Sequence, residues 1–125
     1  MNKTILISGY GSIGRRHAHI LSGLVKKKNI TILTNQKLSN FRTIKTLELS
    51  NKIDPHYIVI CNPTSDHINK IKFIEENYKN KLVLVEKPLF SKPDRINVKK
   101  NKYFVGYNLR FNPIINFLKT KIKSK

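Results

Sequence analysis

Cysteine is scarce in this chain, which limits its covalent chemistry. Cys61 is the only cysteine among 125 residues, so no internal disulfide can form. Its place in the apolar stretch Ile58-Val59-Ile60-Cys61 favours a small buried hydrophobic residue over a nucleophile. Long apolar runs are also missing, because the residues before Ser8 are too few for a signal peptide or a membrane span. We therefore expect a cytoplasmic protein with no membrane partner.

Acidic residues are few as well. Lys and Arg number 25 against 7 Asp and Glu, which gives a formal net charge of +18. Such an excess raises binding of nucleic acid or another polyanion as a hypothesis. The cations are spread through nearly every expected loop and helix, and the segment from Lys99 to Arg110 lacks the glycine spacing of an RNA-binding strand. We therefore expect salt-sensitive, non-specific attraction and no specific nucleic-acid partner.

A glycine-rich turn follows the first apolar run. Ile5-Leu6-Ile7 suits a buried strand, and Gly9, Gly11 and Gly14 then form a GxGxxG pattern. Gly9 permits the tight turn, Gly11 the approach of a pyrophosphate and Gly14 close packing of helix on strand. A surface turn is the alternative, which the flanking strand and helix disfavour. The helix is indicated by apolar residues that share one side: Ile13, Ile20, Leu21 and Leu24.

The second expected strand, residues 30–33, ends without an acid. About 20 residues past the last glycine, where a carboxylate often meets the adenosine ribose, the chain has Thr34 and Asn35. Lys37 and Arg42 follow closely, and this neutral tip with nearby cations tolerates a 2′-phosphate better than a carboxylate would. The sequence therefore favours NADP over NAD, unless these are ordinary loop residues. Beyond them we expect an extended stretch at 41–44 and a short helix at 47–52.

A third strand, residues 57–61, leads into Asn62-Pro63-Thr64-Ser65-Asp66-His67 and a helix. Thr64 or Ser65 can cap this helix. His67 falls in its first turn, where the helix dipole disfavours imidazolium, so we expect a neutral hydrogen-bonding or purely structural histidine. The apolar face of the helix is expected to comprise Ile68, Ile71, Phe73, Ile74 and Tyr78.

A fourth strand, residues 82–85, ends in Glu86-Lys87-Pro88. Doubly wound folds bind ligands at the carboxyl ends of their strands. Glu86 can hold the charge of Lys87 there, and Lys87 can donate a proton or hydrogen bond to a reacting oxygen. The alternative is a surface ion pair at a strand end. A last strand at 103–107 precedes residues 108–113 and an apolar helix that starts at Ile114.

Four motifs in this order resemble the nucleotide-binding domain of the Gfo/Idh/MocA oxidoreductases. They are residues 9–17, residues 62–67, Glu86-Lys87-Pro88 and residues 106–113. The resemblance implies a Rossmann-type doubly wound α/β fold in three layers, with a mainly parallel sheet and helices on both faces. It implies an NAD(P)-binding domain over residues 1–113, while residues 114–125 begin a helix that leads to a missing second domain.

The resemblance also implies hydride transfer to or from a hydroxyl carbon of a sugar, nucleotide sugar or cyclitol. Lys87 would be the catalytic residue that contacts the substrate hydroxyl, with Asn108 and Arg110 as further substrate-site candidates. The Lys87–Pro88 bond is often cis in this family, and no metal is expected. With Lys37 from the charge argument, the expected cofactor-binding residues are Gly9, Tyr10, Gly11, Ser12, Ile13, Gly14, Thr34, Asn35, Lys37, Asn62, Pro63, Thr64, His67 and Glu86.

The chain departs from the family in length. Its 125 residues suffice for one compact domain but not for the second α/β domain that covers the substrate in that family. The segments between Asn35 and Tyr57 and between Pro88 and Tyr103 are also short of full helices. Two interpretations stay open. One is an oxidoreductase, or its amino-terminal half, whose chemistry needs a second domain in the same polypeptide or as another chain, with a homo-oligomer as a further candidate assembly. The other is a stand-alone dinucleotide-binding module.

Overall fold

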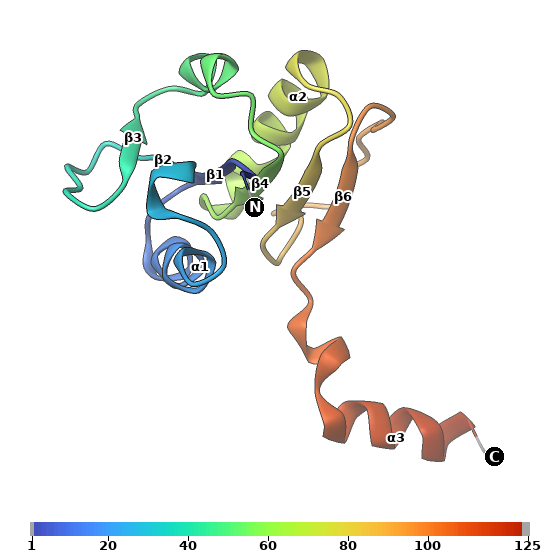
Figure 1. Ribbon diagram of the computed structural model, residues 1–125. Coiled ribbons are helices and arrows are strands. Elements are labelled where there is room, and N and C mark those ends of the chain that lie inside the picture. Colours follow the sequence, from blue (N-terminus) through green and yellow to red (C-terminus); the bar gives the residue numbers. More distant parts are fainter. Residues whose placement is uncertain (1, 124–125) are drawn as a thin grey trace.

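A six-stranded sheet organises the computed structural model, which describes residues 2–123 (Figure 1). The strand order is β3-β2-β1-β4-β5-β6, and every neighbouring pair is parallel. The expected doubly wound α/β fold is confirmed. The strands are β1 (Ile5–Ser8), β2 (Ile30–Leu33), β3 (Arg42–Ile44), β4 (Tyr57–Ile60), β5 (Leu82–Val85) and β6 (Lys102–Val105), and the helices are α1 (Ser12–Ser22), α2 (His67–Asn77) and α3 (Pro113–Lys123).

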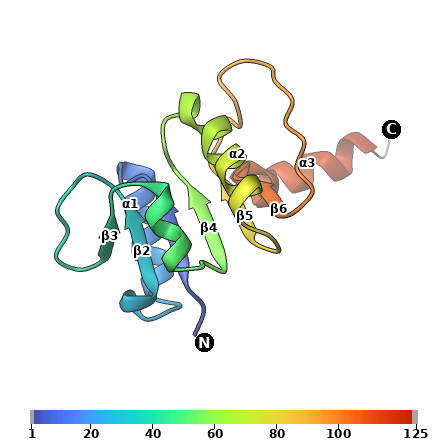
Figure 2. The ribbon, with the colours of Figure 1, turned by 90° about the horizontal axis from the view of Figure 1, so that it is seen from above.

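Helices α1 and α2 cover opposite faces of the sheet, which produces three layers (Figure 2). Successive side chains of a strand point to opposite faces, so central strands flanked by two helices must be apolar throughout. On β1, Leu6 joins the core on the α2 side with Ile71 and Ile74. Its neighbours Ile5 and Ile7 join the core on the α1 side. The run Ile5-Leu6-Ile7 is therefore buried on both faces, as the sequence predicts.

The apolar side expected for α1 packs on the sheet only in part, through Leu21. Ile13 and Ile20 are 43% and 52% exposed, and the buried residues of α1 are Gly14 and Ala18. A Cβ at position 14 would collide with the carbonyl oxygen of Gly9, so the helix lies too close to the glycine turn for a larger side chain. Close packing on small residues overrides the hydrophobic pattern here.

The second helix begins later than its expected cap. Residues Thr64–Asp66 form a 3₁₀ turn, and α2 starts at His67 without a side-chain cap. The prediction that Thr64 or Ser65 caps the helix is wrong, because the Asp66 N–H donates instead to the Pro63 carbonyl oxygen at 2.9 Å. The face packed on the sheet includes Ile71 and Ile74 as expected.

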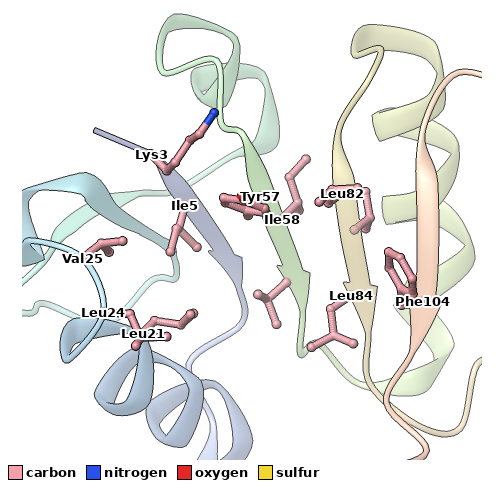
Figure 3. Close-up of a pocket in the computed structure, with 12 residues that line it drawn as sticks. Lys3, Ile5, Leu21, Leu24, Val25, Tyr57, Ile58, Leu82, Leu84 and Phe104 are labelled. Atoms are coloured by element: carbon pink, nitrogen blue, oxygen red, sulfur yellow. The ribbon is translucent and has the colours of Figure 1, made fainter. Parts of the chain in front are cut away.

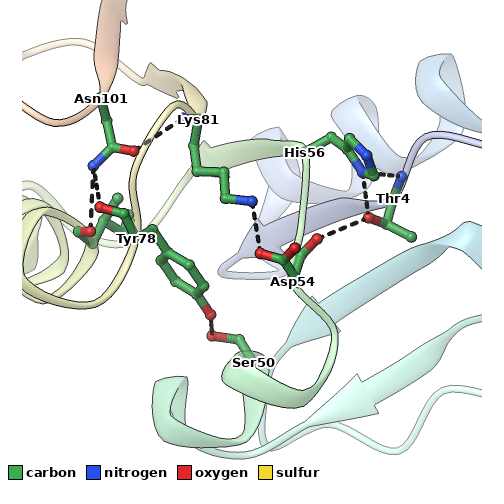
Figure 4. Close-up of polar contacts among 8 residues, drawn as sticks. Thr4, Ser50, Asp54, His56, Tyr78, Lys81 and Asn101 are labelled. Atoms are coloured by element: carbon green, nitrogen blue, oxygen red, sulfur yellow. Dashed lines mark hydrogen bonds and ion pairs between the residues drawn. The ribbon is translucent and has the colours of Figure 1, made fainter.

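Polar contacts tie the strands together at their amino ends (Figure 4). Thr4, His56 and Lys81 directly precede β1, β4 and β5. The Thr4 hydroxyl lies 2.9 Å from His56 Nδ1, and Lys81 Nζ lies 2.6 Å from Asp54 Oδ1. These polar side chains are hydrogen-bonded or ion-paired with one another, so we assign a structural role to the amino edge of the sheet.

A loop connects β5 to β6 in place of a crossover helix, as the short segment predicts. Glu75 on α2 anchors the loop by accepting hydrogen bonds from the backbone N–H groups of Lys99 and Lys100 and from Asn101 Nδ2 and the Tyr103 hydroxyl. Burial alone would raise the pKa of Glu75, but these donors lower it to about 2. The loop is therefore held by a charged carboxylate.

The chain ends in a helix that leaves the sheet. Helix α3 extends away from the body of the domain and has no buried residue (Figure 1). Its apolar residues include Ile114 and Phe117, which are 68% and 58% exposed. The segment 114–125 expected to begin a connecting helix is thus helical through Lys123, while residues 124 and 125 lie outside the described part.

Candidate functional site

The glycine turn lies where the strand order reverses, between β1 and β4. Gly9 has a φ of +98°, and a Cβ there would lie 2.9 Å from the Cys61 carbonyl carbon. By contrast, a Cβ at Gly11 would meet nothing within 4 Å. Helix α1 starts at Ser12, and the N–H groups of a first helical turn have no partner within the helix. Open space beside Gly11 and these donors fit a pyrophosphate.

The tip of β2 lies beside this turn. The Gly9 N–H donates to the Leu33 carbonyl oxygen at 3.1 Å, and the Thr34 N–H donates to the Ile44 carbonyl oxygen at 3.0 Å. The ends of β1, β2 and β3 are therefore adjacent. A crevice of about 280 Å³ opens there and brings together five expected residues, Gly9, Tyr10, Thr34, Asn35 and Asn62, with Leu33, Lys45, Thr46, Leu47 and Lys70.

Two cations of this crevice, Lys45 and Lys70, were not expected from the sequence. Lys37 and Arg42 do not line it. Arg42 pairs with Thr31, two residues before the end of β2, so it lies below the edge of the sheet. The expected extended stretch at 41–44 would have pointed to Lys45, because Lys45 is the first residue after β3.

A second crevice, of about 340 Å³, lies at the ends of β5 and β6. It contains Glu86, Lys87, Asn108 and Arg110, which the sequence analysis placed in the site. The expected cis peptide bond is present between Lys87 and Pro88.

His17 and Arg16 of α1 line this second crevice too, and neither was singled out from the sequence. His17 Nε2 lies 2.6 Å from Glu86 Oε1, and their side chains are 22% and 21% exposed. The signal was available, because His17 stands one turn after Gly14, on the helix face that packs toward the sheet.

His67 and Cys61 support the site without being exposed to it. His67 is 1% exposed, and its ring nitrogens lie 2.9 Å from the Asn62 carbonyl oxygen and 3.1 Å from that of Leu89. It therefore joins the loop after β4 to the loop after β5, in a structural role. Cys61 is half-buried, and burial, with the charge of Glu86 second, raises its thiol pKa to about 12. The thiol stays protonated and is a poor nucleophile, as expected.

An apolar groove of about 530 Å³ lies on the α1 face of β4, β5 and β6 (Figure 3). Leu82, Leu84 and Phe104 line it opposite Leu24, and Lys3 is its one charged lining residue. No described helix covers these strands on this face. With so few polar groups, the groove is unsuited to the phosphates of a nucleotide.

Within residues 2–123 the structure contains no cluster of three or more metal-ligating side chains. The described helices also include none with the length and hydropathy needed to cross a bilayer.

The all-parallel sheet, its strand order and the glycine turn at the switch point define a Rossmann-type domain. No known protein-family profile and no curated protein sequence matches the chain. The WlbA dehydrogenase from Chromobacterium violaceum, solved with NADH and UDP-GlcNAcA, superposes with a TM-score of 0.77 at 16% identity, over 100% of this chain and 41% of that one.

Two further solved structures have a similar fold. The WlbA (WbpB) dehydrogenase from Thermus thermophilus, solved with NAD and α-ketoglutarate, has a TM-score of 0.75 at 16% identity, over 98% of this chain and 47% of that one. The apo scyllo-inositol dehydrogenase from Lactobacillus casei has a TM-score of 0.72 at 18% identity, over 99% of this chain and 42% of that one. These similarities establish the fold, and the chain spans less than half the length of the three enzymes.

Proposed function

We propose that this chain is the nicotinamide-dinucleotide-binding domain of a Gfo/Idh/MocA-type oxidoreductase that acts on a hydroxyl carbon of a sugar, nucleotide sugar or cyclitol. One observation carries the proposal. The glycine turn, the polar tip of β2 and the Glu86-Lys87 pair all lie at the carboxyl edge of one sheet, on both sides of its switch point. A dinucleotide lies across such an edge in doubly wound folds.

The residues divide into two halves. The turn from Gly9 to Gly14 holds the pyrophosphate, and the first crevice, with Thr34, Asn35 and Asn62, holds the adenosine end. The second crevice, with Glu86 and Lys87, is left for the nicotinamide end and the substrate. The bound nicotinamide supplies the hydride chemistry.

Lys87 is proposed to donate or accept the proton that accompanies hydride transfer. Oxidation of an alcohol carbon releases a hydride and a hydroxyl proton, and an ammonium or amine within reach of that oxygen can donate or accept the proton. Glu86 precedes Lys87 directly, but its carboxylate lies against His17, and the structure, which describes both residues, records no ion pair between Glu86 and the exposed Lys87. Asn108 and Arg110 line the same crevice and are proposed to contact the substrate.

A second domain is required for turnover in this proposal. The three solved dehydrogenases are more than twice as long as the part that this chain matches. The exposed apolar residues of α3 and the open crevice around Lys87 also fit contact with a second domain. We propose that the second domain belongs to the same polypeptide or is supplied by another chain. Alone, the chain would bind cofactor without turnover.

The proposed cofactor is NADP(H) in preference to NAD(H), because no carboxylate lines the crevice at the tip of β2. The two similar WlbA dehydrogenases were solved with NAD or NADH, which supports a nicotinamide dinucleotide in general. A cytoplasmic location stays a prediction from the sequence.

Calorimetry with the Gly11→Val variant tests the proposal. Gly11 has φ −76° and ψ −163°, which valine adopts readily, and its Cβ position is open. The variant should keep the fold and lose dinucleotide binding, because its side chain fills the space of the pyrophosphate. Gly23→Val, at the end of α1, is the control that should bind like the wild type. Equal affinity of wild type and Gly11→Val in high salt would refute the proposal.

A further inference from the structure

We propose that Lys45 and Lys70 recognise the 2′-phosphate of NADP(H), and that Lys37 and Arg42 do not. The inference rests on the proposed function, since it requires that the crevice at the tip of β2 binds the adenosine end of the cofactor. It assigns cofactor specificity to two residues that lie 25 positions apart in the chain.

The hydrogen bonds at the strand ends position Lys45. Because the Thr34 N–H donates to the Ile44 carbonyl oxygen at 3.0 Å, the residue after Ile44 stands beside the tip of β2. Neighbouring strands lie about 4.8 Å apart, a distance that a lysine side chain spans. The ribose of a bound dinucleotide meets the tip of the second strand in this fold. Lys45 is therefore placed to reach a phosphate on the ribose 2′-oxygen.

Lys70 lines the same crevice from a different element, helix α2. It belongs to the first turn of α2, is half-buried and lines the crevice with Asn62. His67, one turn earlier, holds the Asn62 carbonyl oxygen at 2.9 Å, so this wall has a defined position relative to the sheet. Two lysines from separate elements that line one crevice can both bind a dianionic group, because each contributes charge-assisted hydrogen bonds.

No carboxylate lines this crevice to oppose the two lysines. Glu48 is on the same loop as Lys45, and its pKa is lowered by its own backbone N–H, by the Thr46 hydroxyl and by the charge of Lys70. It is exposed and is not part of the crevice wall. The crevice is therefore suited to an added phosphate and has no acid for the two hydroxyls of an NAD ribose.

The positions of Lys37 and Arg42 argue against a role for either residue in binding the 2′-phosphate. Arg42 begins β3 and pairs with Thr31, so it is two residues short of the carboxyl edge where the ribose binds. Lys37 is exposed in the turn between β2 and β3 and does not line the crevice.

The test compares fragments that contain only the adenosine end. Calorimetry measures binding of 5′-AMP, adenosine 2′,5′-bisphosphate, NAD⁺ and NADP⁺ to the 125-residue chain, at a salt concentration that suppresses non-specific attraction. Two double variants are compared, Lys45→Ala with Lys70→Ala and Lys37→Ala with Arg42→Ala. Lys27→Ala with Lys28→Ala, at the opposite edge of the sheet, removes the same charge as a control. Circular dichroism and the affinity for NAD⁺ report whether each variant is folded.

We expect the wild type to bind adenosine 2′,5′-bisphosphate more tightly than 5′-AMP, and NADP⁺ more tightly than NAD⁺. The Lys45/Lys70 variant should lose roughly tenfold or more of that preference while it keeps its affinity for NAD⁺ and 5′-AMP. The preference should be unchanged in the other two variants.

Three results would overturn the inference. One is an unchanged preference in the Lys45/Lys70 variant, another is a loss confined to the Lys37/Arg42 variant, and the third is a wild type that prefers NAD⁺. All three leave dinucleotide binding intact and so spare the proposed function. Absence of binding by all four ligands would instead refute the proposed function, and the inference with it.

Discussion

His17 Nε2 on α1 lies 2.6 Å from Glu86 Oε1 at the end of β5. This contact joins the helix that follows the glycine turn to the strand that presents Lys87. Gly106 closes the other side of the carboxylate, because a Cβ at position 106 would lie 3.2 Å from Glu86 Oε2. Glu86 therefore has little freedom, and the backbone that it fixes determines where Lys87 stands.

The first prediction concerns this contact. His17→Ala should lower the free energy of unfolding by roughly 1–2 kcal/mol, because a hydrogen bond between a partly buried carboxylate and an imidazole is lost. Urea unfolding measures the change. His19→Ala is the control, since His19 is exposed on the same helix and its side chain makes no contact that the structure records. Equal losses in the two variants would mean that the His17 contact adds nothing to stability.

The second prediction separates two glycines of one motif. Gly14→Ala should destabilise the fold by roughly 1–3 kcal/mol, because its Cβ collides with the Gly9 backbone. Gly11→Ala should change stability by less than roughly 1 kcal/mol, since its Cβ position is open and the gain from a stiffer unfolded chain opposes the poorer helix cap. Thermal or urea unfolding decides between them, and the reverse order would contradict the packing described for α1.

The third prediction is a pH dependence at Glu75. Its pKa is about 2 in the folded state and 4.5 in its ordinary state, so the carboxylate stabilises the fold above about pH 4.5. That contribution is lost as the pH falls from 4.5 toward 2. Glu75→Gln should therefore be less stable than wild type at neutral pH, with a difference that shrinks in acid. Urea unfolding across this pH range provides the measurement.

The exposed neighbour Glu76 provides the control for Glu75. Glu76→Gln should show no comparable difference from the wild type at any pH. A Glu75→Gln difference that stays constant down to pH 2 would show that the charge of Glu75 is not what anchors residues 99–101.

The fourth prediction concerns Lys87. The chain alone should turn over poorly, because orienting a substrate hydroxyl against the nicotinamide contributes on the order of 7–11 kcal/mol and requires a closed site. If a second-domain partner restores hydride transfer, Lys87→Ala should abolish most of it and leave cofactor affinity nearly unchanged. Steady-state rates and calorimetry on the same samples measure both.

Lys79→Ala, on the opposite edge of the sheet, should keep the full rate in that experiment. Rapid sugar oxidation by the purified 125-residue chain would show that no second domain is needed. An undiminished rate in Lys87→Ala would show that Glu86-Lys87-Pro88 is only the surface end of a strand.

Much of the fold was predictable because its signals are local. The five apolar runs, the extended stretch at 41–44 and the helix that follows the glycine turn each depend on residues close together in the chain. The glycine motif could be interpreted for the same reason, since Gly9, Gly11 and Gly14 perform their roles within a single turn. The missing crossover helix between Pro88 and Tyr103 was likewise visible in a segment that is short of a full helix and interrupted by Pro93.

The sequence by itself determined the order of strands and helices and the presence of a phosphate-binding turn, because steric and hydrophobic periodicity act over a few residues. Only the tertiary structure decided which side chains meet. His17 and Glu86 are separated by 69 positions, and the register of two parallel strands brings Lys45 and Thr34 to one crevice. Close approach of α1 to the sheet likewise selected Gly14 and Ala18 over the larger residues beside them. Contacts of this kind depend on how whole elements pack, which no local pattern specifies.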